Sequence, residues 1–222
     1  MSHSPLETVV LFHLGSVPVS RPVVTTWGLM IALTIGCWLA TRRLRLAAGN
    51  WQAVIEASVV GIEEQISSLL NREPEPFLPL LGSLFIFLIA ANLSGIVPGV
   101  TAPTASIETP AALASIIFVS VHFFGVRFQG LGRYLKSYIK PNPLLLPLNI
   151  LSEITRSFSL AMRLFGNIMS EELVVAIILA LAGLLVPIPF MAFGILVALV
   201  QAYIFSVLAA VYVAGGLGAV EK

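Results

Sequence analysis

The stretch Ser159–Val174 reads SLAMRLFGNIMSEELV and places a permanent cation, Arg163, in a segment otherwise suited to lipid. A guanidinium stays protonated at any ordinary pH, and transferring one into hydrocarbon is costly. Glu172 follows nine residues later in the same run. Because ionisable side chains in membrane spans are rare and mark ion pathways, this pair indicates a protein that transfers ions.

The composition indicates a polytopic membrane protein. Of the 222 residues, 58% are hydrophobic and only 10% are charged, whereas about 25% are charged in soluble domains. The net charge of +1 gives no basic face for phosphates, so no nucleic-acid partner is expected. Cys37 is the only cysteine, which excludes an internal disulfide and a cysteine cluster for a metal. We therefore expect a single membrane domain without a cofactor or a metal.

Charge-free runs divide the chain into five spans. The predicted segments are an outer N-terminal segment (1–22), a span (23–41), an amphipathic helix (51–70), spans at 77–97 and 106–126, a loop (127–143), a long span (144–185) and a last span (189–218). The twenty residues between Arg21 and Arg42 suffice to cross a core of roughly 30 Å. A signal peptide is the alternative for this first run, but no small-residue cleavage site follows it. The fold class is thus all-α, with a long tilted fourth span that forms a hairpin with the fifth.

The segment 51–70 has the pattern of an amphipathic helix. Glu56, Glu63 and Glu64 alternate at helical spacing with six apolar residues. This pattern is typical of a helix that lies on the membrane surface. Packing against another subunit is the alternative.

Basic residues are distributed unequally between the two sides of this five-span arrangement. Nine of the twelve fall on one side, namely Arg42, Arg43, Arg45, Arg72, Arg127, Arg133, Lys136, Lys140 and Lys222. The other side keeps only Arg21, while Arg156 and Arg163 lie in the fourth span. The positive-inside rule then places the N-terminus outside and the loop 127–143 and the C-terminus in the cytoplasm. A bacterial inner membrane is the expected location.

A helix over 144–185 gathers polar side chains on one side. This stripe recurs at steps of three and four residues and comprises Arg156, Ser159, Arg163, Asn167 and Ser170. Gly166 leaves room beside Arg163 for another backbone. Glu172 lies ~13.5 Å and roughly half a turn from Arg163, so the two form no intrahelical salt bridge. For Arg156, a side chain that extends to the membrane interface and a functional role are equally good explanations. Arg163 lies twenty residues beyond Pro143, which is too deep in the span for its side chain to reach the interface.

Four further polar residues are candidates for an ion path. Glu153 could line an aqueous vestibule at the cytoplasmic end, or simply face the interface. Glu108 could gather ions at the outer mouth of the third span, or act as a helix-start acid favoured by the dipole. Glu171, like Glu172, could belong to a solvated outer loop. Gln201 lies mid-span in the last helix and needs hydrogen-bond partners, for which the polar stripe is the obvious source.

These residues resemble a known family, subunit a of the F-type ATP synthase. The block Arg163-Leu164-Phe165-Gly166-Asn167, with Ser159 before it and Glu172 nine residues after the arginine, is similar to the family's central motif. Gln201-Ala202-Tyr203-Ile204-Phe205 resembles its last-helix segment, and Thr104-Ala105-Ser106 resembles the stretch opening its third span. The resemblance covers most of the chain from Phe77 onward. It departs at Ser106, where Asn or Asp is usual, at Glu108, where Asn is common, and at Gly194, where some members carry a histidine.

The resemblance implies roles for individual residues. Arg163 corresponds to the stator arginine that faces the carboxylates of a rotating ring of c subunits. Glu172 corresponds to the relay carboxylate of the outer half-channel, with Ser106 and Glu108 near its mouth. Gln201 and Asn167 correspond to amides close to the arginine and the half-channel. Ser159 lies where a polar residue lines the inner path in the family. Apart from the resemblance, the position of Glu153 near the cytoplasmic end would let the ion leave past it, and Glu171, turned from Glu172 by about 100°, is expected to contribute least.

The resemblance also implies the function and the partners. The chain would be an ion-translocating stator subunit, not catalytic by itself, that couples the flow of protons or sodium ions to ring rotation and ATP synthesis. Its partners would be the c ring, the peripheral-stalk b subunits, the remaining synthase subunits and membrane lipid. A stand-alone secondary transporter or channel is the alternative, although no internal repeat supports it. A haem-bearing membrane anchor is disfavoured, because only three scattered histidines are present.

Overall fold

The computed structural model describes residues 10–14, 17–42, 50–70, 72–96, 102–139, 144, 146–183 and 186–217. It contains two strands, β1 (Val10–Leu14) and β2 (Val17–Ser20), and two short 3-10 turns, η1 (Ser94–Ile96) and η2 (Pro103–Ala105). The helices are α1 (Arg21–Thr41), α2 (Asn50–Leu70), α3 (Leu78–Leu93), α4 (Glu108–Gln129), α5 (Leu131–Ile139), α6 (Leu146–Ala182) and α7 (Pro187–Gly216).

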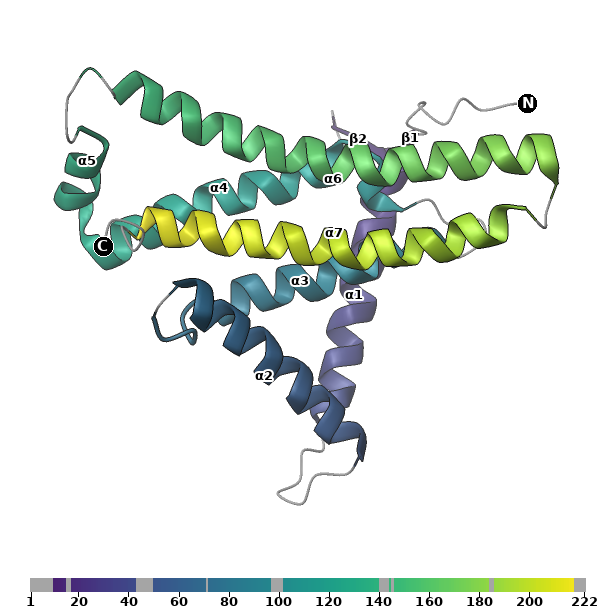
Figure 1. Cartoon of the computed structure of the whole chain (residues 1–222), viewed down its shortest axis with the longest axis horizontal. Coiled ribbons are helices and arrows are strands. Elements are labelled where there is room, and N and C mark those ends of the chain that lie inside the picture. The colour runs from purple at the N-terminus through teal and green to yellow at the C-terminus, as the bar shows by residue number, and fades with distance from the viewer. Residues whose placement is uncertain are drawn as a thin grey trace.

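Four helices, α3, α4, α6 and α7, run side by side and form the bundle that carries the polar residues (Figure 1). The helix α7 packs against α2, α3, α4 and α6. In the view of Figure 1, α1 crosses the direction of the bundle and diverges from it, and α2 leads back from the end of α1 to the bundle. The antiparallel strands β1 and β2 form a hairpin immediately before α1.

Small residues let α7 approach its neighbours closely. Its buried positions include five alanines, Ala198, Ala202, Ala209, Ala210 and Ala214. At the contact with α4, a methyl group on Gly125 would lie 2.9 Å from the carbonyl oxygen of Gly216. Close backbone approach through small residues is how membrane helices gain packing without a hydrophobic driving force between them.

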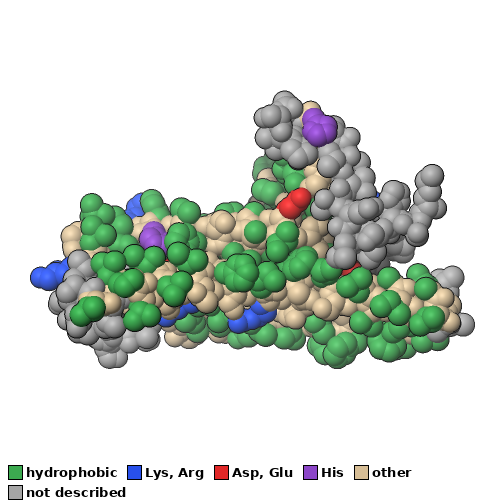
Figure 2. All heavy atoms as spheres, turned by 90° about the horizontal axis from the view of Figure 1, so that it is seen from above, with side chains coloured by type: hydrophobic (Ala, Val, Ile, Leu, Met, Phe, Trp, Pro, Cys, Tyr) green, Lys and Arg blue, Asp and Glu red, His purple; other side chains and the backbone are tan. Residues whose placement is uncertain are grey.

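The outer surface of the described helices is largely apolar. Figure 2 shows hydrophobic side chains over most of the visible face, with few charged groups between them. Four of the described helices, α1, α4, α6 and α7, are long and apolar enough to cross a membrane, while α3 is shorter. This confirms an all-α membrane protein. The 37 residues of α6 span ~55 Å, which exceeds the thickness of a membrane core of roughly 30 Å.

Several segments differ from the sequence-based expectation. The segment 127–143 is not a simple loop, because α4 continues to Gln129 and α5 follows after Gly130, whose φ of 81° makes the turn. The N-terminal segment 1–22, which was predicted without secondary structure, contains the strands β1 and β2. The C-terminal end of α2 packs Ile66 and Leu70 into the core of this same chain. The predicted boundaries at residues 97, 143, 185 and 218 lie outside the described residues.

Candidate functional site

The polar stripe lies on the outward side of α6. All five of its members, Arg156, Ser159, Arg163, Asn167 and Ser170, are exposed. The opposite side of the helix is buried in the bundle through Leu160, Leu164 and Ile168. The stripe is therefore available to a partner along most of the helix, because nothing in the described part of this chain covers it.

Arg163 stands near the midpoint of α6, and no described residue provides it with a counterion. Within the described residues its guanidinium makes no hydrogen bond and no ion pair. A methyl group on Gly166, one turn further along, would meet no atom of the described chain within 4 Å. A permanent cation at membrane depth needs a carboxylate or water, and the open space beside this one lets a partner supply it.

Asn167 links the stripe to the last helix. Its Nδ2 donates a hydrogen bond of 2.7 Å to Oε1 of Gln201 on α7. Gln201 is 3% exposed, and its own Nε2 has no partner among the described residues. The stripe thus supplies one partner for this glutamine, as the sequence analysis expected, and leaves one buried donor unsatisfied.

The two consecutive carboxylates of α6 point to different neighbours, and both are half-buried. Glu172 Oε1 accepts a hydrogen bond of 3.0 Å from the backbone N–H of Ala102, just before η2. Glu171 lies against α7, where a methyl group on Gly194 would come within 1.7 Å of its Oε1. The glycine at 194 is therefore the reason that the Glu171 carboxylate fits between α6 and α7.

Glu108 and Ser106 lie near the same end of the bundle as Glu172. Glu108 is the first residue of α4 and accepts a hydrogen bond from the hydroxyl of Ser20 at the end of β2. Ser106 directly follows η2 and is half-buried, and its hydroxyl makes no hydrogen bond within the described residues. The segment from Ala102 to Glu108 thus brings a carboxylate, a hydroxyl and the N–H bound by Glu172 into one region.

The structure adds a buried polar residue that the sequence analysis missed, Asn92 on α3. Its Nδ2 donates to the carbonyl of Ala198 on α7 at 3.1 Å, and its Oδ1 accepts from the hydroxyl of Thr104 at 2.9 Å. Asn92 is 5% exposed and Thr104 is fully buried. The sequence signal that could have revealed it is a single asparagine in a predicted span that has no charged residue. This network joins α3, η2 and α7 beside the Glu172 region.

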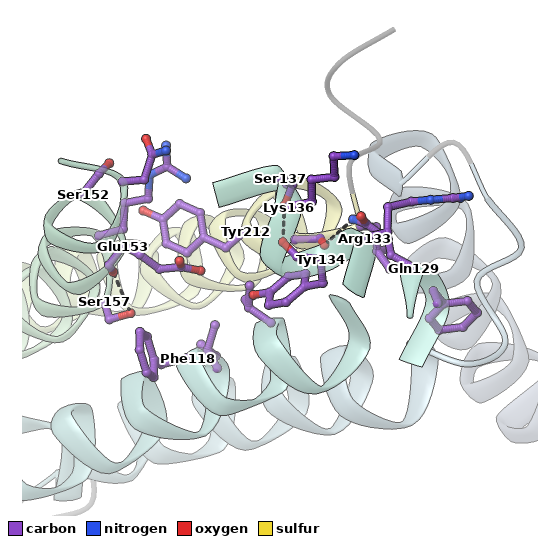
Figure 3. Close-up of a pocket in the computed structure, with 18 of the residues that line it drawn as sticks. Phe118, Gln129, Arg133, Tyr134, Lys136, Ser137, Ser152, Glu153, Ser157 and Tyr212 are labelled. Carbon is purple, nitrogen blue, oxygen red and sulfur yellow. Dashed lines mark hydrogen bonds between the residues drawn. The ribbon is translucent and has the colours of Figure 1, made fainter. Parts of the chain in front are cut away.

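Glu153 lies at the other end of α6, on the wall of a cavity. The cavity has a volume of about 590 Å³ and is also lined by Ser152, Ser157 and Tyr212. Figure 3 shows these side chains on one side of the cavity, with Tyr134, Lys136 and Ser137 of α5 on the other. Glu153 therefore lies on a cavity that is large enough to hold water, as the prediction of an aqueous vestibule requires. Among the described residues, no group of three or more His, Cys, Asp or Glu side chains could hold a metal ion.

The fold and the site together define an integral membrane protein with ionisable groups distributed along its bundle. The sequence matches the family model of the ATP synthase A chain over residues 23–214. The chain therefore belongs to the ATP synthase subunit a family, whose members are ion-translocating components of the F-type ATP synthase. The resemblance found in the sequence is confirmed.

Individual relatives are similar over their whole length. A protein of Bradyrhizobium sp. strain BTAi1, named ATP synthase subunit a 2, is 57% identical over 222 residues, which cover 100% of both chains. A protein of Pelobacter propionicus with the same name is 46% identical over 97% of this chain and 95% of its own. ATP synthase subunit a of Albidiferax ferrireducens is 46% identical over 96% of this chain and 93% of its own.

Proposed function

We propose that this chain is the stator that passes ions to and from the c ring, with Arg163 as the fixed cation facing the ring carboxylates. The supporting observation is the exposure of Arg163 near the midpoint of α6, with no counterion in the described chain and open space at Gly166. A ring carboxylate must be neutral to face lipid. Near Arg163 its ionised form is favoured, so the ion is released there.

The outer half-channel runs through the region around Glu172. An ion from outside passes Glu108 and Ser106 and reaches Glu172, with Glu171 as a second carboxylate facing α7. A carboxylate can hold and release an ion, which an amide cannot do. The backbone N–H of Ala102 fixes one oxygen of Glu172, which leaves the other oxygen to exchange the ion.

The inner half-channel leads from Ser159 to the cavity at Glu153. The cavity lies on the Glu153 side of Arg163, whereas Glu172 lies on the other side of it along α6. Arg163 therefore separates the two paths, and its charge repels a cation that would pass directly between them. Each charge that crosses by way of the ring is worth ~2.3 kcal/mol per 100 mV, and this energy appears as torque.

The sidedness proposed here is five spans, α1, α3, α4, α6 and α7, with α2 on the cytoplasmic surface. The N-terminus is then outside, and α5 and the C-terminus are cytoplasmic. The ring binds the ion, so its own site selects a proton or sodium. The b subunits and the rest of the synthase complete the complex, and this chain binds no nucleotide itself.

Cross-linking to the ring tests the proposal directly. In a Cys37→Ser background, we expect a cysteine at Met162, which is 39% exposed beside Arg163 on α6, to cross-link to a small hairpin subunit in membranes. The matched control is a cysteine at Ile86, which is 40% exposed on α3, away from α6 across the bundle in Figure 1. Equal cross-linking from both positions, or none from Met162, would contradict a ring contact on α6.

The sidedness has its own test. In the same background, we expect a cysteine at Ser137 of α5 to react with a membrane-impermeant maleimide only from the cytoplasmic side, and one at Ser94 only from outside. The reason is the nine-to-one distribution of basic residues. Intact cells expose the outer side of the membrane to the reagent, and inverted vesicles expose the cytoplasmic side. Labelling of both cysteines from the same side would be incompatible with five spans.

A further inference from the structure

The cavity at Glu153 has a second property, which is an excess of positive charge. It lies where α4 and α7 end and α6 begins, with α5 across it (Figures 1 and 3). Four cationic side chains line it, Arg72, Arg133, Lys136 and Arg156, against one carboxylate, Glu153. Arg72 follows α2, Arg133 and Lys136 lie on α5, and Arg156 lies on α6, so the fold brings cations from three different parts of the chain to one cavity.

The four cations have no counterions in the described chain. None of them makes an ion pair there, and all four are exposed at the cavity rather than sequestered. Cations that converge without counterions repel one another, so an anion that enters between them is stabilised. Arginine is especially suited to phosphate, because its planar fork donates two parallel hydrogen bonds.

The position of the cavity favours a lipid over other anions. Helix ends lie at the level of the phospholipid headgroups, where basic pockets between transmembrane helices bind anionic lipids. Tyr134 and Tyr212 line the same cavity, and tyrosines are enriched at this depth because the ring is apolar and the hydroxyl is polar. Phe118 and Ile117 on α4 give one wall an apolar surface for the start of an acyl chain.

We propose that this cavity binds the phosphate of an anionic phospholipid headgroup, with Arg133 and Lys136 as its principal ligands. The binding depends only on the chain lying in a membrane and not on the role of Arg163. A consequence does rest on the proposed function. The described lining of the cavity carries an excess of positive charge that opposes the exit of a cation, and the negative charge of a bound phosphate lowers that opposition.

The test measures lipid binding to the full-length chain purified in detergent. Native mass spectrometry counts bound phosphatidylglycerol, with phosphatidylcholine as the neutral lipid and inorganic phosphate as the competitor. We expect phosphatidylglycerol to bind at one site, and Arg133→Gln with Lys136→Gln to weaken it roughly tenfold or more. The matched control is Arg127→Gln at the same end of α4, whose guanidinium lies 5.9 Å from the Phe123 ring and outside this cavity.

The outcomes distinguish specific binding of the lipid in this cavity from nonspecific attraction to basic residues on the surface. Binding retained within about threefold in the exchange Arg133→Lys with Lys136→Arg supports the site and shows that the fold tolerates change there. The proposal would be overturned if Arg127→Gln weakened phosphatidylglycerol binding as much as the double variant does. It would also be overturned if the unchanged chain bound phosphatidylcholine as well as phosphatidylglycerol. Displacement of the lipid by equimolar inorganic phosphate would overturn the lipid assignment and leave a free phosphate site. None of these results depends on ATP synthesis, so they stand apart from the test of the ring contact.

Discussion

Replacing Arg163 with alanine should abolish ion-driven ATP synthesis while the complex still assembles. The side chain is exposed on α6 and packs against nothing in the described core, so its removal leaves the bundle intact. Without the cation, a ring carboxylate has no reason to ionise at that point and no barrier separates the two half-channels. Loss of one preorganised charge of this kind costs roughly 100-fold or more. The measurement is ATP synthesis by reconstituted vesicles under an imposed ion gradient and potential.

Arg156 provides the matched control for this prediction. It is an exposed arginine on the same stripe of the same helix, two turns closer to the N-terminal end of α6. We expect Arg156→Ala to retain most of the synthesis rate. Arg163→Lys should fail largely as well, because an ammonium lacks the planar fork and can lose its proton when desolvated. Near-normal synthesis by Arg163→Ala, with equal assembled complex, would refute the stator role.

The sequence predicted helices better than it predicted their relationships. Charge-free runs and the polar stripe locate α4, α6 and α7 within a few residues, because the bilayer requires long apolar helices. The helix α5 was read as a loop on account of Arg133 and Lys136. Leu131, Tyr134 and Leu135 nevertheless recur there at helical spacing, so the signal was present.

The site was predictable only where one helix determines it. The stripe on α6 follows from its own period, and the partner of Gln201 follows from the need to satisfy a buried amide. The contact of Glu171 with α7 could not be predicted in this way, because it depends on how α7 packs against α6 and on the absence of a side chain at Gly194. The sequence expected Glu171 to contribute least. The position of its carboxylate between α6 and α7 favours a larger contribution to ion transfer than the sequence suggested.

The second large effect is expected in the outer half-channel. Glu172→Gln should slow ATP-driven ion pumping by about 100-fold, since an amide cannot hold and release the ion. Glu108→Gln should slow it by less than about tenfold, because Glu108 is exposed and water can replace it. Glu171→Gln should fall between them, because its carboxylate is half-buried against α7. The measurement is the initial pumping rate in vesicles with equal amounts of assembled complex.

Gly194 allows the role of Glu171 to be separated from a change in charge alone. A methyl group at 194 overlaps Glu171 Oε1, so Gly194→Ala must expel the carboxylate from its seat without removing it. If Glu171 relays ions from that seat, Gly194→Ala slows pumping as Glu171→Gln does, and the double variant is no slower than either single variant. Additive losses would mean that the two positions act independently. A normal rate for Glu171→Gln would return the relay to Glu172 alone, with Gly194 serving only the packing of α7.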